Sequence, residues 1–182
     1  MKTFRLLLAL LFTTIVMAQS EEKLPYYEIP EYPETYTAGN VAARMVDGLG
    51  FRYYWATEGL TLEDLNYKPS ESGRTSIETI DHLLGLSNFI LNSISKEKKE
   101  KNQNEISFEQ KRKLTLMNIK EASEILRATK DISKFDNDRF PFWNLINGPI
   151  ADALWHCGQV VMLRRASGNP FNSKVSVFSG KV

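Results

Sequence analysis

The sequence predicts an all-α protein built as a four-helix bundle, with an extended N-terminal strap and a short irregular C-terminal tail. Four stretches place apolar residues at helical spacing, over 37–57, 76–94, 107–130 and 149–166. The segments between them are poor in the alternating pattern of strands. The length of 182 residues and the 42% hydrophobic content suit one domain with one core, which we expect over 37–170.

Residues 1–18 have the pattern of a cleavable signal peptide. Lys2 and Arg5 precede an apolar run from Leu6 to Met17, and Ala18 supplies a small residue at the cleavage site. We therefore expect an exported protein, periplasmic or secreted. The only cysteine is Cys157, far from this run, so we expect no lipid or other membrane anchor after cleavage.

Charge argues against a nucleic-acid partner. The formal net charge is +1, and removal of residues 1–18, which hold two basic and no acidic residues, changes it to −1. Neither value gives the basic surface that binds phosphate backbones.

Residues 19–36 are rich in proline and tyrosine, which favours extended backbone rather than helix. The prolines are Pro25, Pro30 and Pro33, and the tyrosines are Tyr26, Tyr27, Tyr32 and Tyr36. Four tyrosines carry too much apolar surface for a free linker, so we interpret the segment as a strap lying over the domain. A binding arm is the alternative. Residues 171–182, with Val175 and Val177 alternating, form a tail that we expect to lie across the bundle.

The first helix, over 37–57, is expected to bury Val41, Met45 and Leu49 on one side. The second begins at Thr75 or Ser76 without a full capping box from Ser76 and Thr79, and its apolar residues cover most of its circumference. In the third, Ser107 and Gln110 have capping-box spacing. Its expected buried residues are Leu114, Met117, Ala122, Ile125 and Leu126. Pro149 is expected to open the fourth.

Candidate metal ligands lie on the second and fourth helices. Helical geometry places Asp152, His156 and Gln159 in one stripe, and Asp at i with His at i+4 can reach the same ion. His82, on the second helix, supplies the other imidazole. Two imidazoles and one carboxylate leave coordination positions open for substrate, which is typical of catalytic rather than structural sites.

Simpler interpretations of the same residues remain open. An Asp152–His156 pair is equally well explained as a buried hydrogen bond, and a lone histidine on an apolar flank, such as His82, is often a core residue. Cys157 does not face His156, because consecutive helical residues point about 100° apart. We therefore interpret Cys157 as a small buried residue.

The stretch Ser76-Ile77-Glu78-Thr79-Ile80-Asp81-His82-Leu83 and the later stretch Asp152-Ala153-Leu154-Trp155-His156-Cys157-Gly158-Gln159 resemble the DinB-like (YfiT-like) superfamily of metal-dependent four-helix proteins. Arg164-Arg165 and Gly168-Asn169-Pro170 resemble it too, so the likeness spans roughly 37–170. The resemblance implies a three-ligand site in which His82 and His156 match two histidines and Asp152 replaces the third. It also implies that Gln159 supports a ligand or a bound water. Several members use low-molecular-weight thiols, which suits an exported protein poorly.

Three other residues complete the candidate site. Gln159 and Arg44 are expected to position ligands, and Glu78, one turn before His82, is expected either to support it or to stabilise the helix dipole. Arg44 is preferred over Arg52 and Arg74 as a pocket residue, because it shares a stripe with aromatic side chains.

The leading hypothesis is therefore an exported metalloprotein, a hydrolase or transferase acting on a small molecule through one divalent ion. Zn, Ni and Fe are the candidate ions. The alternative is a non-catalytic small-molecule-binding or stress-related bundle protein. A homodimer is compatible with both hypotheses.

Overall fold

The computed structural model describes residues 23–98 and 106–182, and it confirms the prediction of an all-α protein. The four long helices are α1 (Ala38–Thr57), α3 (Ser76–Ile94), α4 (Phe108–Arg127) and α6 (Ala151–Ala166). Shorter elements are α2 (Leu62–Asn66), α5 (Phe142–Leu145), the 3-10 turn η1 (Ile132–Phe135) and the π-helical turn η2 (Ile146–Ile150). In the described part, β pairing is limited to one isolated bridge between Ser176 and Lys181.

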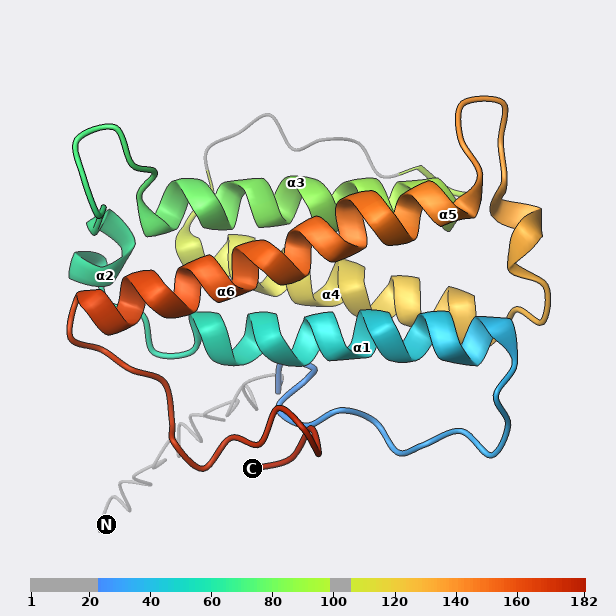
Figure 1. The fold of residues 1–182 in the computed structure, drawn as a ribbon, viewed down its shortest axis with the longest axis horizontal. Helices are drawn as coiled ribbons and strands as arrows, with labels where there is room; N and C mark the ends of the chain where they lie inside the picture. The colour runs from blue at the N-terminus through green and yellow to red at the C-terminus, as the bar shows by residue number, and fades with distance from the viewer. Residues whose placement is uncertain (1–22, 99–105) are drawn as a thin grey trace, which may run out of the picture.

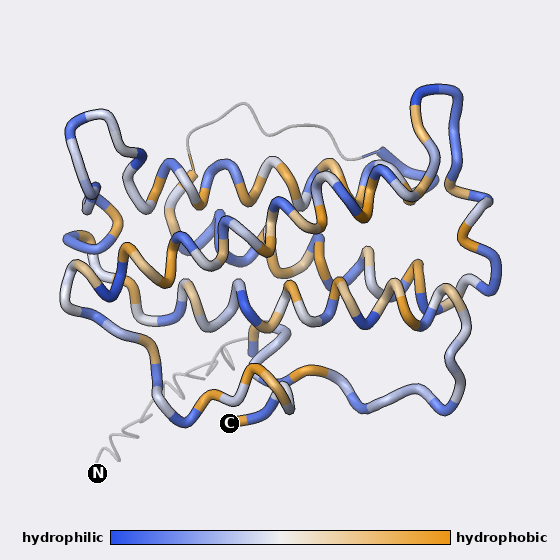
Figure 2. The backbone as a smooth tube through the Cα atoms, in the orientation of Figure 1, coloured by the Kyte–Doolittle hydropathy of each residue, from blue (hydrophilic) through white to orange (hydrophobic). Residues whose placement is uncertain are grey.

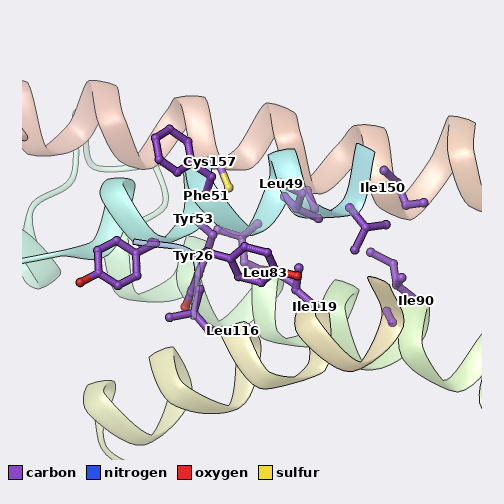
Figure 3. Close-up of a cluster of buried hydrophobic side chains, with 14 of the residues drawn as sticks. Tyr26, Leu49, Phe51, Tyr53, Leu83, Ile90, Leu116, Ile119, Ile150 and Cys157 are labelled. Carbon is purple, nitrogen blue, oxygen red and sulfur yellow. The ribbon is translucent and has the colours of Figure 1, made fainter. Parts of the chain in front are cut away.

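The four long helices lie side by side around a common core (Figure 1). Helix α1 packs against α4 and α6, and α3 packs against the same two helices from the other side. Helices α1 and α6 run in one direction and α3 and α4 in the other. Hydrophobic and hydrophilic residues alternate along each of them (Figure 2), so each helix turns one apolar side to its neighbours. Figure 3 shows the resulting core, which includes Phe51, Leu83, Leu116 and Ile150.

Hydroxyl side chains define where the long helices begin. The predicted capping box of Ser107 and Gln110 is confirmed. In α3, the predicted start at Thr75 or Ser76 is confirmed, because the helix begins at Ser76. Thr75 is the N-cap, and Glu78, at the third helical position, accepts hydrogen bonds from the Thr75 backbone N–H and hydroxyl, at 2.7 and 3.0 Å.

The buried side of α4 also differs from the prediction. Leu114 is exposed and Met117 is only partly buried, whereas Asn118 is buried. The reason is that α4 packs against both α1 and α3, and Asn118 donates hydrogen bonds to Ser87 and Asn88 of α3. Paired polar groups can be buried at such an interface without a large cost. On α1, Val41 and Met45 are likewise exposed.

The final helical run begins seven residues earlier than predicted. Pro149 does not open it, because α5 starts at Phe142 and continues through η2 into α6. Pro149 lies inside the π-helical turn. A wider turn suits proline, which has no N–H to donate and whose ring crowds the preceding helical turn.

The described part of the strap lies against α1. Tyr26 is buried, with its hydroxyl 3.2 Å from Asp47 Oδ1, and Trp55 donates its indole N–H to the Tyr27 carbonyl at 3.1 Å. The C-terminal tail meets the same segment, because the Ile29 N–H donates to the Gly180 carbonyl at 2.9 Å. Strap and tail thus cover one side of α1 together (Figure 1).

The signal-peptide prediction falls on residues 1–18, outside the described residues. Within residues 23–98 and 106–182, no helix combines the length and the apolar character needed to cross a bilayer.

Candidate metal centre

Three side chains that the sequence singled out converge between α3 and α6. His82 Nε2 lies 3.2 Å from Asp152 Oδ2, and His156 Nε2 lies 3.3 Å from Asp152 Oδ1. The two imidazole rings are 4.5 Å apart between centroids and nearly perpendicular. Among the described residues, this is the one group of three His, Cys or acidic side chains whose ligand atoms all lie within 4.8 Å of one another.

Local helix geometry and packing each place part of this group. Asp152 and His156 are one helical turn apart on α6, so their side chains share a face. His82 comes from α3, which packs against α6 along its length. The carboxylate of Asp152 therefore lies between two imidazoles and offers one oxygen to each.

Gln159 contacts the other edge of the His156 ring. Its Oε1 lies 2.7 Å from His156 Nδ1. An amide oxygen accepts hydrogen bonds and cannot donate, so in this contact Nδ1 is the donor. Nε2, on the opposite side of the ring, faces Asp152. This is the supporting role expected of Gln159.

The group is covered on one side and open on the other. The His156 side chain is 13% exposed, whereas those of His82 and Asp152 are 38% and 43% exposed. Three protein donors with a solvent-facing side leave coordination positions for water or substrate. Such openness suits a catalytic or ligand-binding ion better than a structural one.

The other two candidates make different contacts. Arg44 donates to the Pro30 carbonyl at 2.7 Å and lies over the Tyr32 ring, so it holds the strap. Glu78 closes the capping box of α3, and the hydrogen bond from the Thr75 backbone N–H lowers the pKa of its carboxyl. The contacts of Glu78 therefore agree with the expectation that it stabilises the start of the helix.

A pocket of about 780 Å³ adjoins the group at His156, the one of the three ligands that lines it. His156 and Gln159 line it, together with residues that the sequence analysis did not select, among them Trp155 and Met162. The arginine that lines it is Arg74 rather than Arg44. The sequence did contain a signal for these two pocket residues. Trp155 and Met162 are seven residues apart on α6, and residues at that spacing share a helical face.

Cys157 is buried, as expected, and lies beside Phe51 in the core (Figure 3). Burial raises the pKa of its thiol to about 12. The thiol therefore stays protonated and unreactive at neutral pH.

Arg164 and Asn169, two of the motif residues at the end of the last helix, have structural contacts. The buried Arg164 guanidinium donates to the carbonyls of Trp55 and Ala56, at 2.9 and 3.2 Å, and to the Asn169 carbonyl at 2.7 Å. The carbonyls at the C-terminal end of α1 thus gain donors that the helix itself does not supply. These residues join α6 to α1 rather than extending the metal centre.

No family model, curated protein or solved structure matches this chain. The resemblance to the DinB-like superfamily therefore stays a prediction that rests on the motif residues.

Proposed function

We propose that this protein binds one divalent metal ion through His82, Asp152 and His156 and acts as a metal-dependent hydrolase or transferase on a small molecule. The observation that carries the proposal is the convergence of His82, Asp152 and His156, whose ligand atoms lie within 4.8 Å of one another. The contact of His156 Nδ1 with Gln159 Oε1 directs Nε2 toward Asp152 Oδ1, which lies 3.3 Å away. An imidazole nitrogen and a carboxylate oxygen are both common ligands of divalent ions.

The donor spacing fits a single ion. Two donors bound to one tetrahedral ion at about 2.0–2.1 Å lie roughly 3.3 Å apart. His82 Nε2 lies 3.2 Å from Asp152 Oδ2 and His156 Nε2 lies 3.3 Å from Asp152 Oδ1, so each imidazole is at this spacing from one of the two carboxylate oxygens. The donor set of two imidazoles and one carboxylate suits Zn, Ni or Fe, and the carboxylate in place of a third histidine favours harder ions.

The wider assignment is to an exported DinB-like four-helix bundle. The side-by-side packing of α1, α3, α4 and α6 supports a bundle, and the placement of His82, Asp152 and His156 at one centre supports the DinB-like motif match. A bound divalent ion would supply Lewis acidity to a substrate. Within that centre His82, Asp152 and His156 hold the ion, and Gln159 keeps the His156 ring oriented.

Metal content of the purified protein tests the proposal. Protein prepared without an affinity tag, dialysed against zinc and then against buffer, should retain about one ion per chain by mass spectrometry. His156→Ala and Asp152→Asn should retain little. Asp81→Asn is the control, because Asp81 pairs with Lys111 at 2.6 Å and does not belong to the group. Equal and negligible metal in the wild type and His156→Ala would overturn the proposal.

A second candidate function is non-catalytic binding of a small molecule, and the pocket of about 780 Å³ favours it. The two functions differ in what His82→Ala does. In an enzyme, the substitution should abolish turnover of any substrate that a screen of the metal-loaded protein identifies. In a binding protein it should change stability without removing a reaction.

A further inference from the structure

The pocket beside the metal centre has the size of a small-molecule site. It lies between the C-terminal half of α6 and the segment that joins α2 to α3, and its volume of about 780 Å³ falls in the range of ligand pockets. Two of its residues, His156 and Gln159, also belong to the metal centre. A ligand in the pocket would therefore end at that centre.

The walls of the pocket are mainly apolar. Trp155, Met162 and Leu163 line it from α6, and Tyr67 and Pro69 line it from the α2–α3 segment. Trp155 is 73% exposed and Met162 is 63% exposed, although both are large hydrophobic side chains. Two such residues on one face leave apolar surface that no described residue covers.

One arginine, Arg74, lines the pocket, and the described lining residues include no carboxylate. The hydrogen bond from the Thr75 backbone is the main reason why the pKa of Glu78 is lowered. The charge of nearby Arg74 lowers it further, to a smaller extent. The Glu78 carboxylate is already paired with the Thr75 N–H and hydroxyl. The Arg74 guanidinium thus remains the group to which an incoming anion can bind.

We infer that the pocket binds a small organic anion with a flat apolar body. The anionic group pairs with Arg74, the body lies against Trp155 and Met162, and the opposite end reaches His156 and Gln159. That last contact rests on the proposed function, because it places the ligand beside the metal ion. An arginine at one end and a metal centre at the other would orient such a ligand along the pocket.

Two fluorescent probes with the same aromatic body test the inference. 8-Anilinonaphthalene-1-sulfonate carries an anionic group, and N-phenyl-1-naphthylamine is its uncharged counterpart. We expect Arg74→Gln to weaken sulfonate binding roughly three- to tenfold, as loss of one partly exposed ion pair does, and to leave amine binding unchanged. Arg165→Gln is the control, because Arg165 is an arginine of α6 that lines a different, smaller cavity.

A second variant pair tests the apolar wall. Trp155→Ala should weaken both probes roughly three- to tenfold, because both lie against the indole. Trp143→Ala is the matched control, since Trp143 is 68% exposed and lies outside the pocket. Both tryptophans are exposed, so neither substitution should prevent folding.

Zinc binding measured on the same variants separates this inference from the proposed function. Two results would overturn the inference and leave the metal proposal intact. The first is normal zinc binding together with equal affinity for the two probes. The second is a loss of sulfonate binding in Arg165→Gln instead of Arg74→Gln. Sulfonate binding that depends on Arg74 and Trp155 in a protein that binds no zinc would support the pocket and refute the metal centre.

Discussion

His156 places its two ring nitrogens against different partners on the same helix. Nε2 is 3.3 Å from Asp152 Oδ1, one turn earlier, and Nδ1 is 2.7 Å from Gln159 Oε1, three residues later. The three residues form a local arrangement that helical spacing alone can place. Nε2 thus faces the proposed ion, and Nδ1 contacts the residue that orients the ring.

Gln159→Leu should weaken metal binding without abolishing it. The substitution removes the acceptor that orients the ring, and loss of such supporting groups costs roughly 10- to 100-fold in metal affinity. Competition for zinc with a chromophoric chelator measures the change.

Gln159→Glu is the control for this prediction, because a carboxylate oxygen can still accept the Nδ1 hydrogen. It should bind zinc at least as tightly as the wild type. Unchanged zinc affinity in Gln159→Leu would show that Gln159 does not position His156.

At the scale of elements, α1 is shaped by what packs on its outer side. A Cβ atom at Gly50 would lie 2.4 Å from a ring carbon of Tyr26, so this glycine allows the strap to approach the helix closely. A Cβ at Gly48 would meet only the end of the flexible Arg52 side chain, at 3.3 Å. Glycine inside a helix usually weakens it, whereas the structure gives Gly50 a packing role.

Gly50→Ala should lower the free energy of unfolding by about 1–3 kcal/mol, because the added methyl group displaces the Tyr26 ring. Gly48→Ala should instead raise it by roughly 0.5–1 kcal/mol, the usual gain of alanine over glycine within a helix. Urea unfolding of the two variants measures both changes.

The double variant Tyr26→Ala, Gly50→Ala isolates the contact. Once the ring is absent, Gly50→Ala should no longer be destabilising. A Gly50→Ala protein as stable as Gly48→Ala would contradict the seating of the strap on α1.

At the scale of the whole molecule, Asp64 joins α2 to the segment that follows α6. Its carboxylate accepts hydrogen bonds from Thr61 at the start of α2, from Ser167 after α6 and from Asn169, whose amide nitrogen is 2.6 Å away. Burial by itself raises the pKa of this carboxyl, but the hydrogen bonds from Asn169, Ser167 and Thr61 outweigh it and lower the pKa to about 2, from an ordinary value of 3.8.

This low pKa makes the fold sensitive to acid. A carboxyl whose pKa is lower in the folded than in the unfolded protein stabilises the fold above the unfolded value, and loses that effect as the pH falls through the folded value. Asp64 should therefore contribute roughly 2 kcal/mol above pH 5 and lose it between about pH 4 and pH 2.

Urea unfolding at a series of pH values measures this contribution. The difference in stability between the wild type and Asp64→Asn should be largest near neutral pH and should shrink toward pH 2. Glu63→Gln, which removes an exposed carboxylate from the same turn, is the control. A difference that did not vary with pH would refute the role of the Asp64 charge.

Much of the fold was predictable because its signals are local. Apolar spacing and the Ser107 cap depend on residues within one or two helical turns, and so does the stripe of Asp152, His156 and Gln159. The faces of α1 and α4 were less predictable. Leu114 and Val41 are as apolar as their buried neighbours, and their exposure depends on where the adjacent helices lie.

The sequence by itself determined the helical class, the approximate helix positions and the candidate ligands. Tertiary structure decided the rest. His82 and Asp152 are separated by 70 positions, and packing of α3 against α6 brings them within 3.2 Å. Packing also directs Arg44 to the strap and Arg74 to the pocket, a choice that their identical side-chain chemistry could not reveal. The physical reason is the range of the interactions. Helical spacing and capping act between near neighbours in the chain, whereas a shared site depends on which helix faces pack together.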